Sequence, residues 1–290
     1  MRMSTMLKSS LFAAAVTVLG TSAAFAGPAI STWNPAGVGL GGTSITNFDN
    51  FQIADFATIT VDGAGNFTES GALNVLSFTN QGNFINAPGL HSTYSLYYTF
   101  TATGNQGGPV PLVHNTTVNG TFSTLDFTLW ATPHGNTNFT VGAGGVTVGN
   151  NGGKFALATG SLVNGTLSLT NVGAVDAVDA AHALLSPKAD ITVSFEPCLS
   201  AGLVCSGNES AFFVSPDALA TVFQIGDFSA TNSVTHVFPG VPDASHVQVR
   251  IVAGGGNVTA EVPEPVTVSL FGAGLAGVAA LRRRRKGKKA

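Results

Sequence analysis

The side chains best able to do chemistry in this chain are six histidines, two cysteines and fifteen carboxylates. No histidine stands in H-E-x-x-H, H-x-H or another compact spacing that would hold a metal ion. Asp176, Asp179 and His182 lie three residues apart, and steps of three drift around a helix by about 60° each. We interpret these three as part of a helix surface, and we expect neither a metal nor a cofactor.

The sequence shows no motif for a nucleophilic serine and no carboxylate spacing typical of a glycosidase, just as it shows no metal-binding motif. The chain has no G-x-S-x-G turn, which would hold a nucleophilic serine. A glycosidase needs two carboxylates placed across a sugar, and no spacing here pairs any two of the fifteen. We therefore expect that the protein is not an enzyme, and a secreted hydrolase is the catalytic alternative.

The two cysteines, Cys198 and Cys205, lie in the segment PCLSAGLVCSG. In an oxidising compartment they would close a small loop as a disulfide. Metal binding is the alternative, but no histidine lies within the loop and zinc-binding spacings are usually shorter. We predict the disulfide.

The C-terminal segment 262–290 has the layout of a sorting and membrane signal. The residues Val262-Pro263-Glu264-Pro265 precede an uncharged stretch, 266–281, and a basic end, 282–290, that begins with Arg282, Arg283, Arg284 and Arg285. As a helix, the sixteen residues of the stretch would rise about 24 Å. That is short of a hydrocarbon core of about 30 Å, and snorkelling arginines would cover the difference. The positive-inside rule would hold the basic end in the cytoplasm. An ordinary C-terminal anchor is the plainer alternative.

The N-terminal residues 1–26 agree with export. Arg2 and Lys8 precede an apolar run, and Ala24-Phe25-Ala26 fits the A-x-A site cut by signal peptidase. We expect a signal helix that is cleaved after Ala26.

This combination of ends resembles the PEP-CTERM proteins, bacterial surface proteins processed by exosortase. The resemblance implies that Val262–Pro265 is the recognition motif and that Arg282–Arg285 is the basic stop. It also implies transient anchoring in the inner membrane, followed by release to the cell surface or the extracellular matrix. Two segments, LHSTYSLYYTFTATG (90–104) and LDFTLWA (125–131), together with the two-cysteine loop, are similar to flocculation-associated PEP-CTERM proteins. Those proteins are implied to help hold exopolysaccharide around aggregated cells.

Charge narrows the partners of the exported part. Between residues 27 and 265 the only cations are Lys154, Lys188 and Arg250, whereas all fifteen acidic residues lie there, so the net charge is −12. Nucleic-acid binding needs clustered cations, and we therefore exclude it. The acidic surface favours solubility, and exopolysaccharide is the partner we expect from the resemblance.

Short apolar runs separated by Gly and Asn turns predict a chain that is mainly β. The segment 27–50 is interpreted as a flexible lead-in, whose Gly37–Gly42 fits G-x-G-x-x-G without the strand and helix of a nucleotide site. We expect one helix, 175–185, ended by Pro187. Strands are expected at 53–61, 66–78, 92–102, 118–130, 138–148, 154–162, 166–170, 189–196, 212–214, 220–228, 233–238 and 246–252.

Alternation of this kind predicts an antiparallel β-sandwich or a jelly-roll-like ectodomain at 51–261, flanked by the signal helix and the transmembrane helix. The aromatic residues Trp33, Trp130, Tyr94, Tyr97 and Tyr98 could stack on sugars, but in alternating strands we expect them in the core. We expect a structural or adhesive protein of an exopolysaccharide biofilm or floc. A carbohydrate-binding module with an aromatic sugar site is the alternative.

Overall fold

A computed structural model describes most of the exported part of the chain. The described residues are 31–142, 144–177, 185–197, 209–215, 223–226, 236–239 and 247–261. Within them the chain is mainly β and its strands pair antiparallel, as the sequence predicts.

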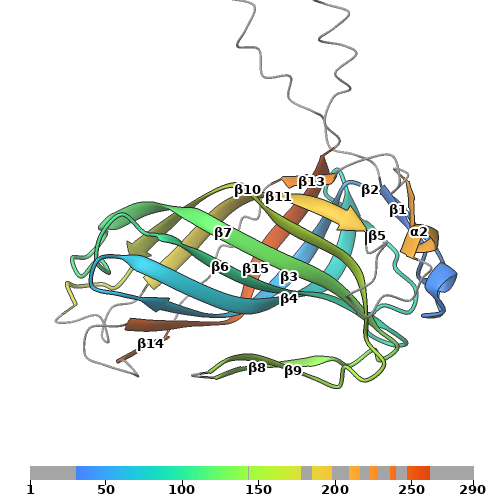
Figure 1. Ribbon diagram of the computed structural model, residues 1–290, viewed down its shortest axis with the longest axis horizontal. Helices are drawn as coiled ribbons and strands as arrows, with labels where there is room; N and C mark the ends of the chain where they lie inside the picture. Colours follow the sequence, from blue (N-terminus) through green and yellow to red (C-terminus); the bar gives the residue numbers. More distant parts are fainter. Residues whose placement is uncertain are drawn as a thin grey trace, which may run out of the picture. The chain divides into compact units, whose positions relative to one another are not determined.

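The main sheet contains ten strands (Figure 1). They are β3 (Asn50–Val61), β4 (Asn66–Asn80), β5 (Asn83–Ile85), β6 (Ser95–Asn105), β7 (Thr117–Thr132), β10 (Phe155–Asn171), β11 (Leu185–Pro197), β13 (Phe223–Gly226), β14 (His236–Pro239) and β15 (Val247–Glu261). Their order is β13-β11-β10-β7-β6-β4-β3-β15-β14, and β5 pairs with β4. Because β13 pairs with β11 on one side and with β15 on the other, the sheet returns to its start. A sandwich or jelly roll would bring two sheets face to face. Here one continuous ladder encloses the core.

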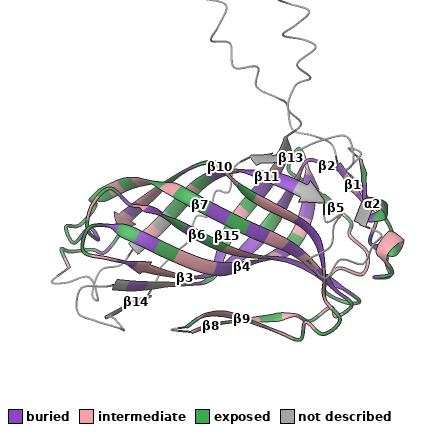
Figure 2. Cartoon of the chain, in the orientation of Figure 1, coloured by how far each residue is buried: buried purple, intermediate pink, exposed green. Residues whose placement is uncertain are grey.

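Buried and exposed residues alternate along the strands of this closed sheet (Figure 2). On β6 the inward positions are Leu96, Tyr98 and Phe100, which the alternation in the sequence predicts to share a face. The turn between β3 and β4 is the hairpin expected from Asp-Gly-Ala-Gly. Its Gly65 has a φ of 85°, and the Gly65 N–H donates to the Asp62 carbonyl at 3.0 Å.

A smaller sheet packs against the same core. It pairs β12 (Phe213–Ser215), β1 (Ser31–Trp33) and β2 (Ile45–Phe48), and it is accompanied by the 3-10 helix η1 (Pro35–Val38) and the short helix α2 (Glu209–Phe212). Trp33 lies at the centre of an aromatic cluster, with five phenylalanine rings at centroid distances of 5.1 to 5.7 Å. The flexible lead-in expected at 27–50 is therefore wrong from residue 31 onward. Burial of Trp33, Ile45 and Phe48 fixes this segment, although its Gly and Asn content indicated a loop.

The hairpin of β8 (Asn138–Gly142) and β9 (Gly145–Gly149) lies outside the closed sheet. It contacts the outer side of β3 and β4. The Phe139 ring stacks on the Phe56 ring with a centroid distance of 4.8 Å, and it contacts the Tyr97 ring edge-on with a centroid distance of 5.9 Å. The single strand expected at 138–148 is thus two short strands joined by a glycine-rich turn.

Two further expectations are corrected. The strands expected at 154–162 and 166–170 are one strand, β10, because Asn164 and Gly165 pair with Thr192 and Ile191 within the ladder, directly after a register shift that follows Leu162. The helix expected at 175–185 does not begin at Val175, since residues 175–177 are not helical, and Leu185 already belongs to β11. Residues 178–184 lie outside the described part.

Candidate functional site

The residues that we expected to direct sorting and processing, and the two cysteines of the predicted disulfide, lie outside the described residues. They are Ala24, Ala26, Cys198, Cys205, Val262, Pro263, Glu264, Pro265, Arg282, Arg283, Arg284 and Arg285. Among the residues that are described, no helix is long and apolar enough to cross a membrane.

Asp176, one of the three residues assigned to a helix surface, instead ties two loops together. Its Oδ1 accepts from the backbone N–H of His114 at 2.7 Å, and the His114 ring pairs with the Gly173 carbonyl through Nδ1. The Ala177 N–H donates to the Leu112 carbonyl at 2.8 Å. Within the described part of the chain, no group of three His, Cys, Asp or Glu residues could hold a metal ion.

Four of the five aromatic candidates are core residues, as we expected. Trp33, Tyr94, Tyr97 and Tyr98 are all buried. Trp130 is partly exposed on the outer side of β7, and its Nε1 donates to Thr99 Oγ1 at 2.9 Å. Lys154 Nζ lies 4.4 Å from the centre of the Trp130 ring, so the ring face that a sugar would use carries a cation.

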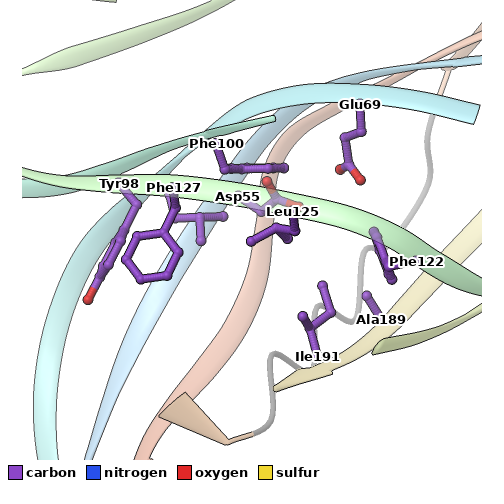
Figure 3. Close-up of a pocket in the computed structure, with 10 residues that line it drawn as sticks. Asp55, Glu69, Tyr98, Phe100, Phe122, Leu125, Phe127, Ala189 and Ile191 are labelled. Carbon is purple, nitrogen blue, oxygen red and sulfur yellow. The ribbon is translucent and has the colours of Figure 1, made fainter. Parts of the chain in front are cut away.

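The interior of the closed sheet holds two carboxylates in an apolar cavity (Figure 3). Asp55 projects inward from β3 and Glu69 from β4, and Figure 3 shows both carboxyl groups turned toward the same space. Phe100, Leu125 and Ile191 are among the apolar side chains that surround them. Sequence alternation could have placed these two residues inward, because each stands two positions along its strand from residues of the apolar face.

Partial burial perturbs Glu69. The loss of hydration raises the pKa of Glu69 from 4.5 to about 8, and the neighbouring Asp55 carboxylate adds to the shift. Glu69 is therefore protonated at neutral pH. Asp55 is only 4% exposed.

The cavity is too small for a sugar. Its volume is about 50 Å³, whereas one water molecule occupies roughly 30 Å³ in the liquid. It therefore has room for one or two waters. A glycosidase places its two carboxylates on opposite sides of a sugar ring. The cavity that Asp55 and Glu69 border has no room for such a ring.

The outer side of the same strands carries cross-strand rows of hydroxyl groups. Thr60, Thr68, Thr103 and Thr124 form one row across β3, β4, β6 and β7. The next row is Thr58, Ser70, Thr101, Asp126 and Ser161, and the third is Thr99, Thr128 and Thr159. We call these twelve residues the hydroxyl face.

Two hollows lie on the hydroxyl face, and Thr101 lines both. The smaller, of about 260 Å³, is lined by Thr99, Thr101, Asp126 and Thr128 with two phenylalanines. The larger, of about 400 Å³, lies over Thr58, Thr60, Thr68, Ser70, Thr101 and Thr103. Neighbouring hydroxyls are close enough to bond, since Thr103 Oγ1 and Thr124 Oγ1 are 2.8 Å apart.

This face can recognise a ligand that is rich in hydroxyls. A threonine hydroxyl donates one hydrogen bond and accepts two, so a row of them can match either polarity of a sugar hydroxyl. Most members are exposed or half-exposed, and Asp126 adds one exposed carboxylate. Sequence analysis followed the apolar half of each alternating strand and missed the polar half. The signal was present as threonine at positions 99, 101 and 103, between the aromatic residues.

Comparison with known proteins identifies one segment of the chain. A family model described as the PEP-CTERM protein-sorting motif matches residues 261–285. The match spans Val262–Pro265 and the uncharged stretch and ends at Arg285, so the predicted resemblance to PEP-CTERM proteins is confirmed. Searches of curated proteins and of solved structures gave no match.

Proposed function

This protein carries the PEP-CTERM motif of exosortase-sorted surface proteins, and from that premise we propose that its β-rich ectodomain, 51–261, holds exopolysaccharide in a biofilm or floc. The motif implies export, processing by exosortase and sorting to the surface. The cleaved signal at 1–26, the transient inner-membrane helix at 266–281 and the structural or adhesive role are parts of the proposal.

The observation that carries the proposal is the hydroxyl face. Three adjacent rows, made up of Thr and Ser side chains apart from Asp126, cover the outer side of neighbouring strands, and two hollows that share Thr101 in their linings lie on that surface. A pleated sheet holds such groups at fixed spacings of about 4.8 Å between strands and about 6.7 Å along them. Because the scaffold is already ordered, binding a polysaccharide costs little further protein entropy.

We propose that the hydroxyl face binds exopolysaccharide without cleaving it. Glu69 borders the larger hollow, but its carboxyl group points into the interior cavity (Figure 3). Asp126 is then the one carboxylate that the described lining of the two hollows presents to a ligand. One carboxylate does not complete the pair that glycoside hydrolysis needs.

The aromatic alternative, a module with a sugar-stacking site, has less support. Trp130 is the one partly exposed member of the five candidates, and Lys154 covers its ring. Stacking on Trp130 would first require displacing the ammonium group.

Co-sedimentation with exopolysaccharide from the native host tests the proposal. The double variant Thr101→Val/Thr103→Val removes two hydroxyls from the larger hollow and preserves the β-branched shape. We expect affinity to fall by about thirtyfold, because two lost hydrogen bonds at about 1 kcal/mol each total about 2 kcal/mol.

The matched control is Thr117→Val/Thr170→Val. These two hydroxyls are 2.8 Å apart across β7 and β10, the same distance as between Thr103 and Thr124, but they line neither hollow. Binding as tight as wild type is expected for the control. Equal binding by both double variants and by wild type would contradict the assignment of the hydroxyl face.

A further inference from the structure

The β8–β9 hairpin forms one wall of the larger hollow on the hydroxyl face. Phe139 fixes it to Phe56 and Tyr97, and Thr58 Oγ1 donates to the Gly142 carbonyl at 3.2 Å. Beyond that bond, Gly144 and Gly145 border the hollow opposite the strands. The hollow is therefore a groove with a hairpin wall, and we call it the hairpin groove.

Glycine keeps the hairpin groove open. A Cβ at Gly145 would lie 3.2 Å from Ser70 Oγ, which is tighter than ordinary contact, and the φ of Gly145 is 111°. A Cβ at Gly144 would meet nothing within 4 Å. A side chain at Gly144 would thus project into open space at the groove wall without a steric conflict.

The side chains that line the hairpin groove are mainly hydroxyls, and Ala102 and the two hairpin glycines add apolar surface. Its floor is Thr58, Thr60, Thr68, Ser70, Thr101 and Thr103, and Gln248 lies at its edge. The Glu69 carboxyl points into the interior cavity instead (Figure 3). Arg250, which is paired with Thr58 across β15 and β3, does not line the groove, and its guanidinium donates to Gln248 Oε1 at 3.2 and 3.3 Å.

We propose that the hairpin groove binds a short segment of uncharged polysaccharide, an inference that rests on the proposed function and gives it a ligand class. The groove volume of about 400 Å³ is within the range of roughly 300–1,000 Å³ of small-ligand sites, which suits an oligosaccharide stretch. Hydroxyl and amide groups can both donate hydrogen bonds to sugar hydroxyls and accept hydrogen bonds from them.

Charge separates this ligand from the polyanionic alternative. A polyuronate would bring carboxylates to a protein segment of net charge −12, and no described residue that lines the groove offers a cation to pair with them. An uncharged glycan meets no such repulsion. Its binding should also respond little to salt, because no ion pair is screened.

The test is calorimetric titration of the mature protein with uncharged gluco-, galacto- and manno-oligosaccharides and with an oligouronate. We expect saturable binding of at least one uncharged series, with a Kd that changes less than about twofold between about 0.05 and 0.5 M salt. Gly144→Trp, which fills the groove wall, should weaken that binding by at least about tenfold.

Gly255→Trp is the matched control. Gly255 is exposed on β15, pairs with Ala54 and also has nothing within 4 Å of a Cβ, but it lies outside the groove. The Gly255→Trp variant should bind the uncharged oligosaccharide with the same affinity as wild type. Thermal melts of both variants must match, so that lost binding is not lost folding.

Three outcomes would overturn the inference. Gly144→Trp could bind the uncharged oligosaccharide as tightly as wild type, or the oligouronate alone could bind, or neither series could bind while host exopolysaccharide still co-sediments. Each leaves the proposed function standing with another site or ligand. A protein that binds no oligosaccharide and does not co-sediment with host exopolysaccharide would refute both.

Discussion

Replacing Glu69 by Gln removes a partly exposed carboxyl group whose pKa is raised to about 8. Glutamine keeps the shape of the side chain but cannot ionise. Below pH 4.5 the wild-type carboxyl is protonated in the folded and the unfolded chain. Between pH 4.5 and about 8 the unfolded chain loses the proton while the folded chain keeps it, so the free energy of unfolding falls as pH rises.

The size of the fall follows from the pKa. A carboxyl whose pKa rises from 4.5 to about 8 corresponds to a loss of about 5 kcal/mol at full effect. Glu69 is partly exposed, and solvent screening reduces the loss to about 2–3 kcal/mol. For a domain of this size that is about 5–10 °C in Tm.

Thermal melts of wild type and Glu69→Gln between about pH 5 and pH 9 measure this directly. The Tm of the variant minus that of wild type should rise by about 5–10 °C across the range. Asp55→Asn supplies a second arm. It removes the smaller cause of the shift, so the folded-state pKa of Glu69 should be lower, and the fall should end at a lower pH and be smaller. The fall should persist, since burial is the larger cause. Parallel curves for wild type and Glu69→Gln would refute the reasoning.

Three further predictions concern packing and processing. Trp33→Ala should destabilise the fold by about 3–5 kcal/mol in urea unfolding, because it empties the centre of the aromatic cluster, and a cost below about 1 kcal/mol would contradict that role. Gly160→Ala should lower Tm strongly, since its Cβ would lie 1.9 Å from the Ser194 carbonyl oxygen, whereas Gly144→Ala should leave Tm unchanged. Alanine at Pro263, Glu264 and Pro265 together should cause uncleaved precursor to accumulate on immunoblots of host membranes, and normal processing would show that the motif is not read.

Strand positions were largely predictable because side-chain alternation survives in the sequence. Leu96, Tyr98 and Phe100 share a face by periodicity alone, and the Asp-Gly-Ala-Gly turn fixes the first hairpin. The closure of the sheet was not predictable, because it depends on the pairing of β13 with two strands far apart in sequence. Nothing local to residues 223–226 specifies those partners.

The lead-in and the predicted helix show where local patterns fail. Trp33 stands in a Gly- and Asn-rich segment, yet contacts with distant rings such as Phe78 and Phe213 outweigh the weak local propensity. Asp176 and Ala177 form hydrogen bonds to the loop at 112–114, and these replace the helical bonds that the composition favoured.

The candidate site was only half visible in the sequence. Threonine at every second position of 99–103 indicates a polar outer side, but the rows exist only because the register aligns Thr103 with Thr68 and Thr124. The hairpin wall depends on Phe139 reaching Phe56, a contact between residues far apart in the chain. Strand register and long-range packing depend on tertiary structure, and local patterns in a single sequence do not predict them.

The most direct measurement is the amount of polysaccharide retained on cells of a host strain that lacks this protein. The strain is complemented with wild type, with Thr101→Val/Thr103→Val or with the control Thr117→Val/Thr170→Val, and surface levels are matched by immunoblot. We predict that deletion lowers cell-bound polysaccharide and aggregation, and that wild type and the control restore both while the hydroxyl-face variant does not. Unchanged polysaccharide retention in the deletion strain would contradict the account.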